Sequence, residues 1–306
     1  ILYRLVGSEM CIRDRPGIGI KEATSSNDNE FVQETYYATS FASVENIRSL
    51  DEDGVSPHLE KVDDKTLRLF YSSIEVKGIA VSLCDYELKC EIQGALERMS
   101  DLTIIETLDG VRRGYYVALN PQTKQKDIFT AVFSEDGLSY SNETPLGFPV
   151  DQNEIAWGVP DAVLMPDGLV RVYWVYTEDK TSDEKLVSAT SKTTKGVEFV
   201  MDPGYRLENG YVDFEVIRAV EGDWKALMSY TPHYMPEIPQ SLFYATSKDG
   251  LNWDLIEERI TPKGYSYFDP TAIQIDDKNF LVVGSAAPNT LGAREHVLFA
   301  AELVLP

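Results

Sequence analysis

A four-part phrase repeats five times along this chain of 306 residues, and this repeat constrains the fold more than any other feature. Each copy starts with a short strand-like run that carries a polar residue near its beginning. A turn rich in Asp, Glu or Gly follows, then a second run, and then a third run that leads to a Trp, Tyr or Phe. The opening runs are VSPHLEKV from Val55, SDLTIIETL from Ser100, VPDAVLM from Val159, VDFEVIRAV from Val212 and FDPTAIQI from Phe268. Repeats of this length indicate solenoids, propellers or arrays.

The spacing and the shortness of the runs select among these architectures. The five copies begin about 45 to 59 residues apart, which is room for four short strands each. The best helical candidate is EIQGALERM at residues 91–99, one or two turns long. Four-stranded units repeated around a ring protect their sheet edges by closing. We therefore predict an all-β fold, a five-bladed β-propeller with four-stranded antiparallel blades. A pair of β-sandwiches would not repeat one phrase five times, and a solenoid repeat would be shorter.

The two ends of the chain bear on how the ring closes. The segment from Phe31, FVQETYYATSFASVENIRSL, echoes the end of a unit, whereas the last unit, 268–306, lacks a fourth strand of its own. An N-terminal strand is therefore expected to complete the final blade. Residues 1–16 match no later pattern and look like a translated sequencing adapter from metagenomic reads, so we treat them as a non-native artefact and 17–306 as a single domain. The native N-terminus is then missing, and a secreted or periplasmic location stays open.

Two turns after third runs are nearly identical. They read SEDGLSY at 134–140 and SKDGLNW at 247–253, and SKTTKGVEF at 191–199 is a longer version. Asp-Gly after a strand fits a tight hairpin, because glycine adopts positive φ without a steric penalty. We interpret these turns as structural.

The net charge and the cysteine content limit the partners and ligands that we expect for this protein. The formal net charge of −22 repels phosphate backbones and anionic membrane surfaces, which excludes nucleic acid and membranes as expected partners. Such acidity favours solubility, or a cleft for a neutral or cationic ligand. Cys84 and Cys90 could form a disulfide or stay free thiols, and no Cys/His pattern indicates a zinc site. We expect a monomer with no cofactor, and leave a structural ion in the funnel open.

Several phrases resemble one superfamily of propeller enzymes. GVPDAVLMPDGLVRVYWVY, LVSATS, SLFYATSKDGLNW and YFDPTAI resemble the five-bladed glycosidases, which include glycoside hydrolase family 43 and the invertase-like family 32 group, and related chains often labelled exo-sialidases. The resemblance covers about residues 31–306 as repeat texture. It implies a carbohydrate-active propeller of the glycoside hydrolase type. The inner runs lack the arginine triad of sialidases and the WMNDPNG-like stretch of invertases, which disfavours both of those activities.

In a propeller the first strand of each blade lines the central funnel. Glycoside cleavage needs an acid and a second carboxylate, and carboxylates on different first strands would converge there. Alignment of the copies puts one residue of each copy at the strand start: Ser56, Asp101, Asp161, Asp213 and Asp269. In the second copy, Thr103 is the alternative to Asp101 for this position. Two residues further, on the same side of each strand, are His58, Thr103, Val163, Glu215 and Thr271. Glu215 would be the only acid at this second level.

These positions lead to a catalytic hypothesis and to its alternative. Glu215 is predicted to be the general acid. Asp161 or Asp269 would orient the sugar or tune the pKa of Glu215, and Asp213 could share the role of Glu215. The candidate substrate-binding residues are Trp157, His58, Asp101, Tyr234 and His233. The resemblance to family 43 implies a first-blade Asp as base, where this chain has Ser56. Either Asp269 takes that role, or the funnel is a non-catalytic module that binds glycans or proteins. The aspartates also have a structural interpretation, as acceptors of backbone N–H groups at the strand starts.

Overall fold

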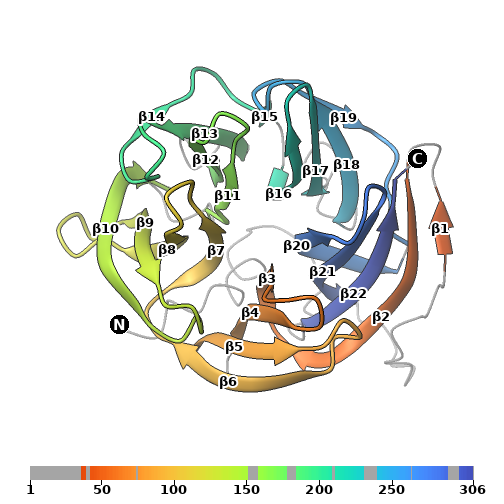
Figure 1. The fold of residues 1–306 in the computed structure, drawn as a ribbon. Helices are drawn as coiled ribbons and strands as arrows, with labels where there is room; N and C mark the ends of the chain where they lie inside the picture. Colours follow the sequence, from red (N-terminus) through yellow and green to blue (C-terminus); the bar gives the residue numbers. More distant parts are fainter. Residues whose placement is uncertain are drawn as a thin grey trace, which may run out of the picture.

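The computed structural model describes residues 36–38, 42–73, 75–150, 158–177, 184–208, 211–230, 240–262, 264–288 and 296–305. These residues form strands and turns, and none of them belongs to a helix that could cross a membrane. The strands make five antiparallel sheets arranged around a central axis (Figure 1). The predicted five-bladed β-propeller is confirmed.

Each blade is a meander that runs outward from the axis. The first blade contains β3 (Val55–Lys61), β4 (Leu67–Ser73), β5 (Gly78–Cys84) and β6 (Cys90–Leu96). The second contains β7 (Ser100–Glu106), β8 (Arg112–Leu119), β9 (Lys126–Phe133) and β10 (Tyr140–Pro149). The third contains β11 (Asp161–Leu164), β12 (Val170–Tyr176), β13 (Lys185–Ser191) and β14 (Phe199–Met201), and β15 (Leu207–Glu208) also pairs with β13. The fourth contains β16 (Tyr211–Val220), β17 (Asp223–Tyr230), β18 (Ser241–Ser247) and β19 (Trp253–Ile256).

The fifth blade combines both ends of the described chain. It contains β20 (Tyr265–Gln274), β21 (Asn279–Pro288) and β22 (Val297–Val304), and its fourth strand is β2 (Ser43–Asp53). In Figure 1 the orange β2 lies alongside the blue β22, with Ser43 opposite Val304 and Ser49 opposite Phe299. The predicted closure by an N-terminal strand is therefore confirmed. From the YYATS phrase, β1 (Tyr36–Ala38) forms a fifth strand outside β2.

One local prediction is wrong. Residues 91–99 are not helical: most of them form β6, the outer strand of the first blade. Cys90 lies opposite Cys84 of β5, and the two form a disulfide, which resolves the alternative that the sequence left open. The turn between them packs against the closing strand, where Arg48 of β2 donates a hydrogen bond to the Glu87 carbonyl at 3.0 Å and the buried Leu88 lies in the same apolar cluster as Leu50. Pairing with β5 outweighs a short helical pattern.

The hydrophobic core is divided among the blade interfaces. The described residues form five apolar clusters, and each cluster joins two neighbouring blades. Between the fourth and fifth blades, for example, Tyr244 packs with Phe280 and with Ile47 of the closing strand. Burial of apolar area is the main stabilising term in folding, so every blade depends on both of its neighbours.

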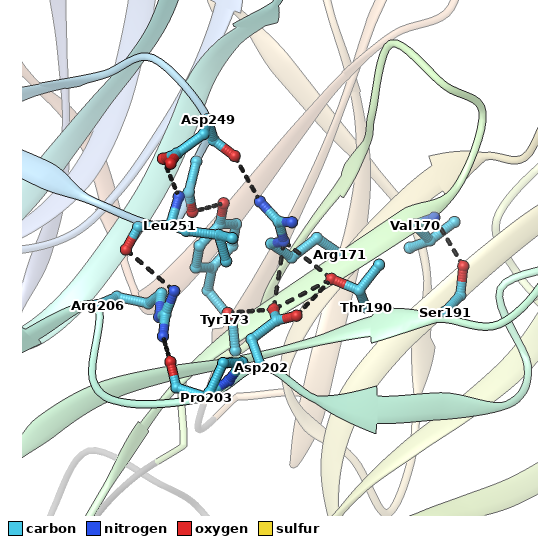
Figure 2. Close-up of polar contacts among 12 residues, drawn as sticks. Val170, Arg171, Tyr173, Thr190, Ser191, Asp202, Pro203, Arg206, Asp249 and Leu251 are labelled. Carbon is cyan, nitrogen blue, oxygen red and sulfur yellow. Dashed lines mark hydrogen bonds and ion pairs between the residues drawn. The ribbon is translucent and has the colours of Figure 1, made fainter.

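The Asp-Gly turns also join blades, as Figure 2 shows for the third and fourth. Within the turn at 247–253, Asp249 Oδ1 accepts the N–H groups of Leu251 and Asn252, at 2.8 and 2.9 Å. The backbone carbonyls of this turn face the third blade and accept three hydrogen bonds from side chains. Arg171 donates to Asp249 O at 2.9 Å, Tyr173 to Gly250 O at 2.7 Å, and Arg206 to Leu251 O at 3.0 Å. Gly250 has a φ of 68°, and a Cβ there would lie 2.8 Å from Trp224. These contacts agree with a structural role for the turn.

Candidate functional site

The first strands bring residues of all five blades to one small cavity on the axis. In Figure 1 the strands β3, β7, β11, β16 and β20 lie innermost. The cavity has a volume of about 30 Å³, and its lining consists of Ser56, Pro57, His58, Asp101, Leu102, Thr103, Val159, Pro160, Asp213, Phe214, Glu215, Asp269 and Pro270. That volume holds about two water molecules. Five of the predicted site residues thus share one lining: His58, Asp101, Asp213, Glu215 and Asp269.

The register of the strands corrects the predicted alignment of Asp161. Asp161 pairs with Tyr173 of β12, as Thr103 pairs with Tyr115 of β8 and Glu215 with Leu227 of β17. Asp161 therefore lies at the second level, beside Glu215, and the prediction that Glu215 is the only acid there is wrong. The third blade has Val159 at the first level, and Val163 lies beyond the second.

The cause of this offset is a backbone feature that residue patterns conceal. Three of the first-level residues sit in a β-bulge with positive φ: Ser56 at 49°, Asp101 at 52° and Asp269 at 47°. Val159, also followed by a proline, has a φ of 38°. A branched residue rarely adopts such a φ, so Asp161 was the natural but wrong choice for this position.

We call the first-level residues Ser56, Asp101, Val159, Asp213 and Asp269 the first belt. Its polar members connect neighbouring blades by hydrogen bonds. Asp213 Oδ2 accepts the N–H of Asp269 at 3.0 Å, and Asp269 Oδ2 accepts the N–H of Ser56 at 3.1 Å. The Ser56 hydroxyl donates to Asp101 Oδ1 at 2.7 Å, and the Ser285 hydroxyl donates to Asp269 Oδ2 at 2.7 Å. One continuous chain of bonds therefore runs from the fourth blade through the fifth and first to the second.

The second belt comprises His58, Thr103, Asp161, Glu215 and Thr271, and four of these side chains accept an N–H from the next blade. The donors all lie one residue past the belt position: Ile104 to His58 Nε2 at 3.0 Å, Val216 to Asp161 Oδ2 at 2.8 Å, Ala272 to Glu215 Oε1 at 3.4 Å, and Leu59 to Thr271 Oγ1 at 3.3 Å. Thr271 also donates its hydroxyl to Glu215 Oε1 at 3.1 Å. This regular pattern agrees with the structural interpretation of the axial residues.

Burial shifts the protonation of these acids. It raises the pKa of Asp101 to about 6 and that of Asp161 to about 7, because the charged forms lose their hydration. Burial, and then the charge of Asp269, raises the pKa of Asp213 well above its usual value. Burial, and then the charge of Asp161, does the same for the pKa of Glu215. The carboxyl groups of Asp161 and Glu215 therefore act on each other, and the pair keeps a proton to a higher pH than isolated acids would.

The axial histidine is neutral. Burial lowers the pKa of His58 below its ordinary value of 6.5, and Nε2 is the acceptor for the Ile104 N–H. This geometry fits a structural acceptor. Among the described residues, no group of three or more His, Cys, Asp or Glu side chains is arranged to hold a metal ion.

Two further residues near the axis were missed in the sequence. Glu184 comes directly before β13 and is buried, and its charge contributes to the raised pKa of Asp213. His296 comes directly before β22, and burial lowers its pKa while the charge of Asp269 opposes that shift. Both precede the third strand of a blade, a position that the search along first strands did not include. The predicted Trp157, His233 and Tyr234 lie outside the described residues.

Comparison with known proteins places the fold. No protein-family model matches the sequence, and no curated protein matches it. Among solved structures, the chain is similar to a thermostable family-43 glycoside hydrolase, with 14% identity, a TM-score of 0.63, and coverage of 83% of this chain and 90% of that one. It is also similar to an endo-arabinase from Bacteroides thetaiotaomicron, with 12% identity, a TM-score of 0.61, and coverage of 82% and 94%.

A third solved structure extends this group. It is a family 117 glycoside hydrolase from the marine bacterium Zobellia galactanivorans, with 12% identity, a TM-score of 0.58, and coverage of 82% of this chain and 84% of that chain. The chain therefore has the five-bladed architecture found in glycoside hydrolases, as its repeat texture indicated. At these identities the likeness defines the fold, and function has to be argued from the site.

Proposed function

We propose that this protein is a carbohydrate-active propeller that binds a sugar at the axial opening and hydrolyses its glycosidic bond. One observation carries the proposal: acids from three blades, Asp101, Asp213, Glu215 and Asp269, line the same cavity. The fold is shared with glycoside hydrolases. The sugar ring lies outside the cavity, since a sugar-sized site is at least about ten times larger than 30 Å³.

Glu215 is the general acid in this scheme. Its carboxyl is buried, and it accepts bonds from Thr271 and Ala272 through the same oxygen, Oε1. Its pKa is raised well above the usual value, so it keeps its proton to a higher pH than an ordinary glutamate and can donate that proton to a leaving oxygen. The charge of Asp161 adds to this shift, so Asp161 tunes that proton.

Asp269 is the second carboxylate. The family-43 resemblance implies a base on the first blade, where this chain has Ser56, and Asp269 holds the Ser56 N–H at 3.1 Å from the neighbouring blade. Its charge also helps to raise the pKa values of Asp101 and Asp213, and it opposes the lowering of the pKa of His296. Asp269 thus takes the position next to the missing carboxylate, with Asp213 as its partner. Trp157, Tyr234 and His233 remain candidate sugar contacts, as do His58 and Asp101.

The second candidate function is a non-catalytic glycan- or protein-binding propeller. Ser56 favours this alternative, because its hydroxyl cannot act as a carboxylate base. The two belts favour it as well, since oxygens of Asp161, Asp213, Glu215 and Asp269 are occupied by bonds from neighbouring blades. A catalytic carboxyl needs an oxygen that is free to reach the substrate.

Turnover of a panel of aryl glycosides distinguishes the two functions. If the protein is a hydrolase, Glu215→Gln lowers kcat by about 100- to 10,000-fold. The amide oxygen can still accept the bonds from Thr271 and Ala272, so the variant should fold. Glu91→Gln, on the exposed side of β6, is the matched control and should retain full activity. No turnover on any glycoside, together with glycan binding on an array, would favour the binding module. Equal activity in Glu215→Gln would remove Glu215 from the mechanism.

A further inference from the structure

One carboxylate oxygen on the axis has no donor. Asp213 is 1% exposed, and its Oδ1 has no hydrogen-bond partner among the described residues, whereas Oδ2 accepts the N–H of Asp269. A buried acceptor without a donor costs about 1 to 3 kcal/mol. Because Asp213 also lines the axial cavity, a ligand that brings a donor into this cavity would recover that cost.

The surroundings of this oxygen are negative. The charges of Asp269 and Glu184 both act on Asp213, and the Asp269 carboxyl belongs to the residue whose N–H Asp213 Oδ2 accepts at 3.0 Å. The cavity lining contains no Lys or Arg, and its histidine, His58, uses Nε2 as an acceptor. Two carboxyl groups this close need a proton or a cation between them. In the free protein a proton on Asp213 meets this need, because the pKa of Asp213 is raised well above its usual value, and a cationic donor can replace that proton where a neutral hydroxyl cannot.

Size and ligand geometry narrow the kind of cation. A cavity of about 30 Å³ admits one or two groups the size of a water molecule and excludes a sugar ring. The described residues contain no group of three or more side chains arranged as metal ligands. An ammonium group has the right size and charge, and it offers three donors to acceptors on different strands.

We propose that the axial cavity takes the ammonium group of an amino sugar, with Asp213 Oδ1 as its acceptor and Asp269 as the second carboxylate, while the sugar ring remains at the opening. This inference rests on the proposed function, because it names the sugar class of the same site. Anionic sugars are disfavoured at this position, since the lining offers them no cation.

Calorimetric titration at about pH 6.5 tests the proposal with four methyl glycosides. Two carry an ammonium group, the 2-amino-2-deoxy- and the 6-amino-6-deoxyglucoside, and two are neutral, the glucoside and the N-acetylglucosaminide. We expect at least one amino sugar to bind about tenfold or more tightly than both neutral sugars, as a charge-assisted bond provides. Asp213→Asn should abolish this preference, since the amide is uncharged and similar in shape.

Asp254→Asn is the matched control, because it removes one negative charge on the exposed face of β19, away from the axis. This variant should still bind amino sugars more tightly than neutral sugars. That result would show that the preference comes from a contact with Asp213 and not from general attraction by the net charge of −22. Equal affinity for all four sugars, tighter binding of the neutral ones, or a preference unchanged in Asp213→Asn would overturn the proposal. Failure to bind any of the four would also overturn it. The proposed function is judged separately, by turnover and array binding of other glycosides.

Discussion

At the scale of single residues, the axial acids have two tasks that conflict. Asp161 and Glu215 accept backbone bonds that join neighbouring blades, and both are buried where a charge is costly. The folded state keeps protons on them that the unfolded chain would release. The same chemistry that suits a general acid therefore makes the stability of the ring depend on pH.

The free energy of unfolding should fall as the pH rises through about 7, the pKa that burial gives Asp161 in the folded protein, and it should keep falling above that pH while Asp213 and Glu215 retain their protons. Below about 7 the folded protein holds a proton on Asp161 that the unfolded chain has lost, and the raised pKa values of Asp213 and Glu215 act in the same direction. Deprotonation of each group costs up to about 1.4 kcal/mol per pH unit. His58 and His296, whose pKa values burial lowers, act in the opposite direction only below 6.5. Urea unfolding at three pH values measures the slope.

Two variants test which residues cause this pH dependence of the unfolding free energy. Asp161→Asn should reduce the pH dependence, because it removes one of the titrating groups, whereas the exposed Asp254→Asn should leave it unchanged. Stability that is flat or rises over this range would contradict the raised pKa values at the axis.

Residue positions were predictable to the extent that side chains alternate along a strand. Asp213 and Glu215 line the expected cavity because β16 keeps the two-residue period between them, and Asp269 lines it from the bulge in β20. Asp161 was placed one step wrong, because the preceding Val159 takes the unusual φ that an Asp or Ser takes in three other blades. A bulge leaves no regular mark in the sequence when a valine occupies it. Glu184 and His296 were missed because they directly precede third strands, and the search followed the first strands.

At the scale of elements, the disulfide hairpin of the first blade supports the strand that closes the ring. Cys84 and Cys90 fix the turn whose Glu87 carbonyl receives Arg48 of β2, and Leu88 packs near Leu50. The sequence left the disulfide open because a separation of six positions between the cysteines fits a hairpin and also fits two unlinked thiols. The pairing of β5 with β6 is what brings the two residues opposite each other.

Cys84→Ser with Cys90→Ser should lower the unfolding free energy by about 2 kcal/mol, since the unfolded chain gains freedom when the loop opens. It should also speed amide hydrogen exchange in β2, a strand of another blade. Exchange mass spectrometry resolves the effect strand by strand. Arg48→Ala is the comparison, because it removes only the bond to Glu87 and should have a smaller effect. Unchanged exchange in β2 would show that the hairpin does not support the closing strand.

At the scale of the whole molecule, each blade interface is a separate apolar cluster, and the two clusters that flank the fifth blade form only when the ring closes. The repeat made this architecture predictable, because every blade reuses one pattern of strands and turns. The likeness to solved propellers at 14% identity or below indicates that the fold tolerates almost complete change of sequence. The predicted sugar contacts Trp157, His233 and Tyr234 lie outside the described residues and stay predictions.

Ile47→Ala in the closing strand should destabilise the entire propeller by about 2 to 5 kcal/mol, because Ile47 is buried between the fourth and fifth blades. The loss should appear as one cooperative transition in denaturant, since every blade shares an apolar cluster with each of its neighbours. Ile92→Ala is the matched control on the outer strand of the first blade, where the side chain is 45% exposed, and it should cost less than about 0.5 kcal/mol. Two separate transitions would indicate that blades unfold independently.

The pairing of β2 with β22 has a consequence for synthesis on the ribosome. Strand β2 is translated first among the four that complete its blade, and β22, its partner, leaves the exit tunnel only after the other blades have been made. During most of translation the nascent chain therefore carries an orphan edge strand that can pair with another polypeptide. Chaperone dependence and swapping of β2 between copies are the hazards that this order of assembly creates.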